Sequence, residues 1–292
     1  MSKKDNVLIA AARRWLHAQL VSSGVLVIGS DGIPSNSDKD NKPSCEIGRF
    51  VAERLKAKKG RKLTAQKVGS IFEKLICEFV KMTFPHLQHL RPGKWTVANL
   101  GNINAVKTSS FAQYEHLAHL SDIVQKDRQL ATMLGNDYVI APDIVVSRSP
   151  CSDEEINALG TVIDNTVCLK TDIRNKNNTL EIMHASISAK WTMRSDRAQN
   201  SRTEALNLIR NRKGHLPHVV VVTGEPLPSR LASLALGTGD IDCVYHFALN
   251  ELVEATEAFS KDGREDVIEL LNTMINGKRL RDISDLPLDL SC

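Results

Sequence analysis

Four consecutive valines constrain the fold of this chain most. They lie in the stretch His218–Thr223, between Pro217 and Gly224. A short apolar run bounded by turn residues is typical of a buried strand. Two further stretches, Tyr138–Val146 and Leu180–Lys190, are also candidate strands.

Helical periodicity accompanies these strands. Apolar residues between Val68 and Val80 recur at helical spacing and form one wide stripe, which predicts a core helix. Weaker helical patterns cover Asn6–Leu20, Ile47–Leu55, Phe111–Leu134, Glu251–Phe259 and Asp266–Ile275. Helices that flank buried strands predict an α/β fold with a central mixed β-sheet. No stretch reads as an interdomain linker, so we expect a single domain over residues 1–292 with elaborated loops.

Composition restricts the class of protein only loosely. Lys and Arg outnumber Asp and Glu by 38 to 34, a net charge of +4 that permits a polyanionic partner without requiring one. The six cysteines include no C-x-x-C pair, which indicates reduced thiols rather than a zinc site. No apolar run suits a signal peptide or a membrane span. We therefore expect a soluble, cytoplasmic protein.

The first chemical candidate is Asp143, which follows a proline inside the apolar stretch A-P-D-I-V-V. A buried carboxylate is costly unless it is paired or bound to a metal. An isolated P-D pair is most often a turn cap at a strand end. Asp143 therefore needs partners elsewhere in the chain before it indicates catalysis.

The second candidate is the pair Ser188 and Lys190 in H-A-S-I-S-A-K. On a strand these two side chains project from the same face, about 6.6 Å apart. A lysine beside a carboxylate-bound cation can orient an attacking water and offset charge on a phosphate. The tripeptide alone is weak evidence, since S-x-K is common.

The third candidate is the segment R-S-D-R and the helix that it opens, predicted over about Asp196–Arg212. Arg197 and Glu204, seven residues apart, share one flank of that helix. Arginine forks match guanine O6 and N7, and aspartate accepts from the cytosine amino group, so Arg194, Asp196 and Arg197 suit a G·C-rich site. The alternative is a surface helix whose charged side chains are solvated and bind nothing.

Together these motifs resemble a known family. The pattern is P-D at 142 and 143, S-x-K at 188–190 and W-T-x-R-S-D-R-A-Q-N-x-R-x-E ending at Glu204. It is similar to the NgoMIV-type type II restriction endonucleases of the PD-(D/E)xK nuclease superfamily. The superfamily's second acidic residue is replaced here by Ser188, and the displaced carboxylate corresponds to Glu204. The resemblance extends from about Gly29 to the C-terminus, and the role of the first ~25 residues stays open.

The resemblance implies a restriction-endonuclease-like core and Mg²⁺-dependent hydrolysis of double-stranded DNA. The catalytic residues that it implies are Glu73, Asp143, Ser188, Lys190 and Glu204, with the metal held by Asp143, Glu204 and the carbonyl of Ala189. The resemblance implies that Arg194, Asp196 and Arg197 read a CCGG core. It further implies that Asp38 and Arg230 read the outer base pairs and that Gln66 contacts the minor groove.

The implied site is GCCGGC, cut after the first G to leave a four-base 5′ overhang. The resemblance further implies a homotetramer, a dimer of dimers that engages two sites, and a cognate DNA methyltransferase as genetic partner. Two alternatives stay open. A DNA-binding regulator without nuclease activity would keep the base readers, and another metal nuclease of the superfamily would keep only the catalytic core.

Overall fold

The computed structural model describes residues 7–101, 105–126, 129, 132–133, 142–193, 195–237, 239–261 and 264–292. For residues 105–107, 121 and 195–197 it describes the main chain only. The chain divides into two compact units. Unit 1 comprises Met1–Arg91, Ile187–Thr203 and Val219–Cys292, and unit 2 comprises Pro92–Ser186 and Glu204–His218. The single domain expected from the sequence stays a prediction.

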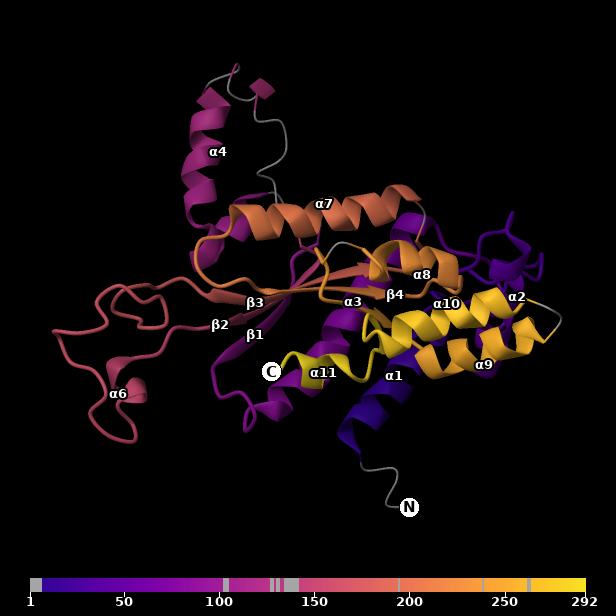
Figure 1. Ribbon diagram of the computed structural model, residues 1–292, viewed down its shortest axis with the longest axis horizontal. Coiled ribbons are helices and arrows are strands. Elements are labelled where there is room, and N and C mark those ends of the chain that lie inside the picture. The colour runs from indigo at the N-terminus through magenta and orange to yellow at the C-terminus, as the bar shows by residue number, and fades with distance from the viewer. Residues whose placement is uncertain are drawn as a thin grey trace. The chain divides into compact units, whose positions relative to one another are not determined.

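The strands form one mixed, six-stranded sheet in the order β1-β2-β3-β4-β5-β6. Strands β1 to β4 are labelled in Figure 1. Their bounds are β1 Trp95–Asn99, β2 Ile144–Arg148, β3 Ile182–Lys190, β4 His218–Thr223, β5 Cys243–His246 and β6 Leu280–Asp282. In unit 2, β1 pairs antiparallel with β2; in unit 1, β4 and β5 are parallel, as are β5 and β6. The predicted α/β class with a central mixed sheet is confirmed, and this arrangement is consistent with a restriction-endonuclease-like core.

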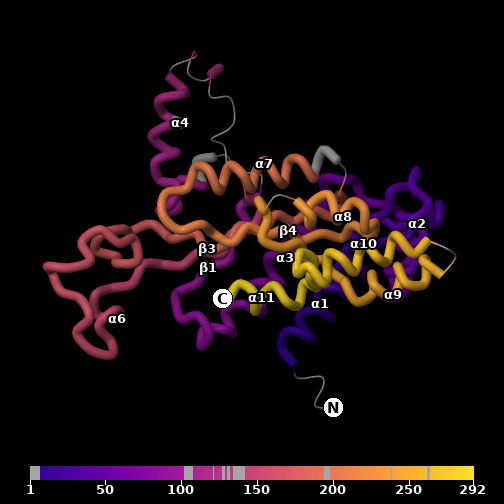
Figure 2. Tube along the Cα trace, viewed as in Figure 1, coloured from indigo at the N-terminus to yellow at the C-terminus, as the bar shows by residue number. Residues whose placement is uncertain are grey.

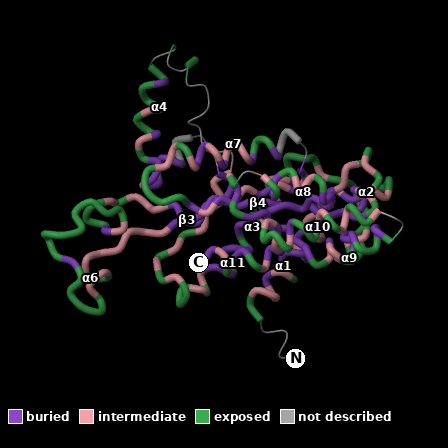
Figure 3. Tube along the Cα trace, in the orientation of Figure 1, coloured by how far each residue is buried: buried purple, intermediate pink, exposed green. Residues whose placement is uncertain are grey.

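The valine run forms β4 over the predicted bounds, and Val219–Thr223 is buried (Figure 3). Of the predicted strand Tyr138–Val146, only the end lies in β2, which begins at Ile144, and residues 138–141 lie outside the described ranges. The sequence reading missed β5 and β6, which have only four and three residues, too few to show a period.

Helices of unit 1 follow the apolar stripes. They are α1 Leu8–Ser22, α2 Lys42–Arg54, α3 Ala65–Thr83, α8 Pro228–Ala235, α9 Leu249–Ser260, α10 Glu265–Asn276 and α11 Leu286–Asp289, with the 3₁₀ helix η2 Phe84–Leu87. The predicted core helix is α3; it starts at the N-cap Thr64, whose side chain accepts a hydrogen bond from the amide of Lys67, and it buries Phe72, Ile76 and Val80.

The N-terminal helix α1 belongs to the core of unit 1. Leu16 and Leu20 are fully buried, and α1 packs on α3. Arg13 forms two forked ion pairs, with Asp282 (Nε–Oδ1 and Nη2–Oδ2, both 2.9 Å) and with Glu251 (Nη1–Oε1 3.0 Å, Nη2–Oε2 2.6 Å). The role that the sequence left open for the first ~25 residues is therefore, for α1, a structural one.

Unit 2 contains a further set of helices and 3₁₀ helices. They are η3 Ala105–Ser110, η4 Ala112–Tyr114, α4 His116–Lys126, α6 Asp153–Ile156 and α7 Ser195–Asn211, which begins in unit 1. A single helix over Phe111–Leu134 was wrong, because η4 and a turn precede α4. The side chain of Gln113 bonds both the amide and the carbonyl of Met183 (2.9 and 2.7 Å), and this contact anchors the start of the segment to β3.

Residues 149–181 of unit 2 form loops around the short helix α6 (Figure 2). Buried Arg174 anchors them through a forked ion pair with Asp153, with both nitrogen–oxygen distances 2.6 Å. Across the described residues of both units, no helix is long and apolar enough to cross a membrane.

Candidate functional site

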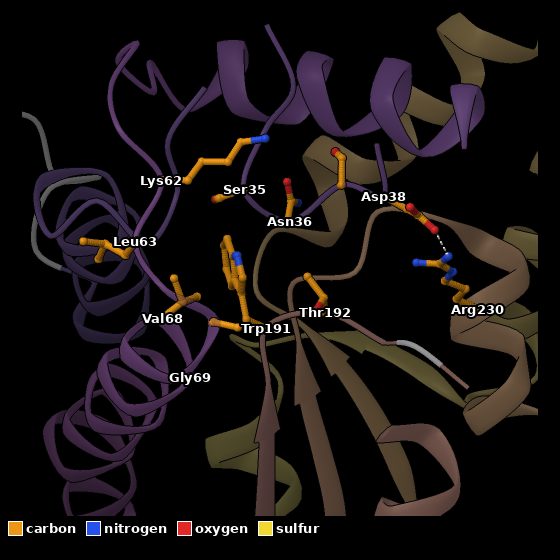
Figure 4. A pocket seen from close by; sticks show the side chains of 12 residues that line it. Ser35, Asn36, Asp38, Lys62, Leu63, Val68, Gly69, Trp191, Thr192 and Arg230 are labelled. Carbon is orange, nitrogen blue, oxygen red and sulfur yellow. Dashed lines mark hydrogen bonds and ion pairs between the residues drawn. The ribbon is translucent and has the colours of Figure 1, made fainter. Parts of the chain in front are cut away.

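Two predicted base readers meet in unit 1. Asp38, in the loop before α2, and Arg230, on α8, are 192 positions apart in the sequence, and their side chains form an ion pair (Figure 4). Both side chains are about one-quarter exposed. The structure therefore brings together the carboxylate and the guanidinium that the family resemblance assigned to one task.

A pocket of about 210 Å³ lies beside this ion pair. Its lining consists of Ser35, Asn36, Ser37, Asp38, Lys62, Leu63, Ala65, Val68, Gly69, Trp191, Thr192 and Arg230. The Asn36 amide donates to the carbonyl of Gly224 at 2.8 Å, which sets its orientation. Asn36 Oδ1 and Trp191 Nε1 are buried and have no hydrogen-bond partner among the described residues. Buried polar atoms are usually hydrogen-bonded, so these two are exceptions within residues that line the pocket.

Trp191 holds the chain between β3 and α7 against the end of β4. Its ring packs on those of Phe72 and Phe247, with centroid distances of 5.1 and 5.3 Å. A Cβ at Gly224 would come within 2.5 Å of the indole, so only glycine permits this approach without a shift. The predicted motif W-T-x-R-S-D-R therefore leaves the sheet from a rigid starting point.

The sequence reading missed Glu225, which follows Gly224. Its side chain is fully buried, and it contacts both Arg230 and the main chain of Met193. Burial raises the pKa of this carboxyl to about 7, although hydrogen bonds from two amides and the charge of Arg230 oppose that shift. The only signal in the sequence was an acidic residue two positions after the end of β4, and that position alone does not indicate burial.

The catalytic candidates of unit 1 lie on β3 and α3. Ser188 and Lys190 are half-buried and alternate with buried Ala189, which confirms that both side chains project from one face of the strand. Glu73 on α3 is half-buried next to Phe72, whereas Glu78 on the same helix is exposed. Glu73 therefore lies at the edge of the apolar stripe, as expected.

Unit 2 contains the two predicted metal-binding carboxylates. Asp143 is only 6% exposed and directly precedes β2; its carbonyl accepts hydrogen bonds from the amides of Leu100 and Gly101 at 2.9 and 3.4 Å. Glu204 is half-buried on α7 beside buried Ala205. Within the described part of the chain, no three His, Cys, Asp or Glu side chains gather into a metal cluster. Carboxylate and carbonyl oxygens are nevertheless the types of ligand that Mg²⁺ prefers, together with several retained waters.

The remaining predicted readers are described less completely. Arg194 lies outside the described residues, and for Asp196 and Arg197 only the main chain in the first turn of α7 is described. Gln66 is exposed in the first turn of α3, the helix whose residues Ala65 and Gly69 line the pocket.

Comparison with known proteins agrees with the motif. Residues 16–292 match the family model described as NgoMIV restriction enzyme. The chain is also 46% identical over 287 residues to the type II restriction enzyme NgoMIV from Neisseria gonorrhoeae, an alignment that covers 98% of this chain and 99% of that protein.

Proposed function

We propose, from the premise that the chain belongs to the NgoMIV restriction enzyme family, that it cleaves double-stranded DNA at GCCGGC with Mg²⁺ as cofactor. Family membership makes the protein a site-specific restriction endonuclease. It thereby favours an enzyme over the DNA-binding regulator considered above. The proposal adds the recognised sequence, the cut after the first G that leaves a four-base 5′ overhang, the metal and the residues responsible.

The ion pair between Asp38 and Arg230 carries the proposed specificity. In the major groove, guanine presents O6 and N7 as acceptors, and its paired cytosine presents an amino donor beside them. A guanidinium and a carboxylate held side by side offer the complementary donors and acceptor. The pair therefore suits the edge of a single outer G·C base pair, while Arg194, Asp196 and Arg197 would read the CCGG core and Gln66 the minor groove.

The proposed hydrolysis depends on five side chains. Asp143 and Glu204, with the carbonyl of Ala189, would hold Mg²⁺, which lowers the pKa of bound water and stabilises charge on the scissile phosphate. Lys190 orients the attacking water and offsets the developing negative charge. Ser188 shares the strand face of Lys190, and Ser188 and Glu73 would support the site from beside it.

The proposal extends to assembly and partners. We expect a homotetramer, a dimer of dimers that binds two copies of the site, and a cognate methyltransferase that protects the host's own sites. Analytical ultracentrifugation with and without duplex DNA tests the assembly. A monomer at all concentrations would contradict it.

The decisive experiment is digestion of a plasmid of known sequence by the purified protein with Mg²⁺. We expect discrete fragments whose ends map to GCCGGC and carry four-base 5′ overhangs, and no cleavage when EDTA replaces the metal. Fragments that end at another sequence would contradict the proposed specificity. Unchanged cleavage in EDTA would contradict the role of the metal.

Replacement of Arg194 by alanine tests the proposed reading of the core. We expect a loss of about 1–3 kcal/mol of discrimination at one guanine of CCGG, because the variant lacks a forked donor to O6 and N7. Competition binding with duplexes substituted at single positions measures it. Arg210→Ala, which removes an exposed arginine from the far end of α7, is the control. Equal weakening on every duplex would assign Arg194 to a phosphate.

A further inference from the structure

The carboxylate of Glu225 occupies a junction of three segments in unit 1. It follows β4, and its side chain is fully buried. Oε2 accepts a hydrogen bond from the amide of Met193 at 2.8 Å, and Oε1 accepts one from the amide of Leu227 at 3.2 Å. Nη1 of Arg230 lies 3.8 Å from Oε2. One side chain thus contacts the chain entering α7, the start of α8 and an arginine on α8.

Both of the contacted segments carry proposed base readers. Met193 immediately precedes Arg194 and the first turn of α7, where the readers of the CCGG core lie. Arg230 in turn forms the ion pair with Asp38 that suits the outer base pair. The loop containing Asp38 is held at the same place, because Asn36 donates to the carbonyl of Gly224, the residue before Glu225.

We propose that Glu225 is a positioning residue that determines specificity, and that it couples the reading of the outer base pair to the reading of the CCGG core. It acts through Arg230 on the first and through the amide of Met193 on the second. The inference rests on the proposed function, since it assigns Glu225 a role in recognising that same site.

Two physical arguments support this role. An arginine side chain carries much rotamer entropy, so a guanidinium held between two carboxylates before DNA arrives loses less freedom on binding. Main-chain anchoring at Met193 limits where α7 can begin, and a shift of about 1 Å is enough to spoil a directed polar contact.

The ionisation of Glu225 has a cost for folding. Its folded-state pKa is raised to about 7, so the protonated form contributes stability that is fully present below the ordinary carboxyl pKa and is lost as pH rises through about 7. The charged groups that face it are Arg230 on α8 and Asp38 in the loop before α2. An apolar side chain would fill this space without the cost of a buried charge. The ionised carboxylate of Glu225 instead serves recognition, because it holds Arg230 in place.

The test compares Glu225→Gln with Arg230→Ala. Discrimination is the ratio of kcat/KM on a GCCGGC duplex to kcat/KM on duplexes with the outer pair or one core pair substituted. We expect Arg230→Ala to lower outer-pair discrimination only. Glu225→Gln should lower outer-pair and core discrimination together, each about 10- to 100-fold, as for loss of a charge-assisted hydrogen bond.

Further variants separate positioning from a general structural effect. In the double variant that combines Glu225→Gln with Arg230→Ala, outer-pair discrimination should equal that of Arg230→Ala alone, because Glu225 acts on the outer pair through Arg230. Glu225→Asp keeps the charge and should restore part of both ratios. Glu251→Gln removes a carboxylate from a separate ion pair of unit 1, so it should lower the Tm without changing either ratio.

The pH profile of the wild-type protein tests the idea without a substitution. Protonation of Glu225 below about pH 7 should lower both ratios, and Glu225→Gln should show no such change. The proposal is overturned if a folded Glu225→Gln variant retains the wild-type value of outer-pair or of core discrimination. A loss of activity that is equal on all duplexes would overturn it as well. If the wild-type protein itself fails to prefer GCCGGC, the proposed function fails and this inference with it.

Discussion

Asp143→Asn is expected to slow DNA cleavage by about 10³-fold or more while sequence-specific binding persists. Asparagine keeps the shape of this nearly buried side chain but lacks the charge that attracts a divalent cation. The proposed base readers lie on other segments, so their contacts should survive. Single-turnover cleavage measures the first effect, and gel-shift titration on cognate and substituted duplexes measures the second.

Asp172→Asn provides the matched control, because it removes an exposed carboxylate from the same unit. It should leave both cleavage and binding unchanged. A folded Asp143→Asn variant that loses specific binding, at metal concentrations supporting wild-type binding, would contradict this separation of recognition from hydrolysis.

Among the substitutions proposed for this protein, Arg13→Ala should have the largest effect on stability. We expect it to lower the free energy of unfolding by about 3 kcal/mol. The substitution leaves Asp282 and Glu251 without the guanidinium that binds both, and their side chains are only 8% and 16% exposed. Urea denaturation followed by circular dichroism measures the loss. Arg14→Ala removes the adjacent, exposed arginine and should change stability by less than about 0.5 kcal/mol.

The effect of Arg13 should depend on pH. Burial alone would raise the pKa of Asp282, but the hydrogen bonds and charge of Arg13, with bonds from Ser284, together lower it. A carboxylate with a lowered pKa contributes stability that is present above its unfolded pKa and lost as pH falls through the folded value. The difference between wild type and Arg13→Ala should therefore be full at pH 7 and shrink below about pH 4. An equal difference at both pH values would contradict the electrostatic explanation.

Much of the local structure was predictable. The valine run gave β4 its bounds, and the apolar stripe gave α3, because both patterns repeat with the period of the backbone that they form. The alternation around Ala189 predicted that Ser188 and Lys190 share a face. The break before α4 was not predictable, since Gln113 interrupts the helical pattern through hydrogen bonds to Met183, a residue 70 positions away.

The residues of the candidate site likewise fall into those that local sequence patterns indicated and those that only long-range contacts revealed. The motif residues were found from their types and spacing together with the family resemblance. The shared face of Ser188 and Lys190 follows from the two-residue period of a strand alone. Glu225 was missed because G-E-P reads as an ordinary turn, and nothing in those letters indicates that the carboxylate is buried against Met193 and Arg230.

By itself the sequence determined the α/β class, the principal helices and strands, and the chemical motif of the family, since period, capping and side-chain chemistry are properties of neighbouring residues. Only the tertiary structure decided that Asp38 pairs with Arg230 across 192 positions and Arg13 with Asp282 across 269. Such pairs depend on the path of the whole chain. Burial then determines their strength, because a charge removed from water must find its partner within the fold.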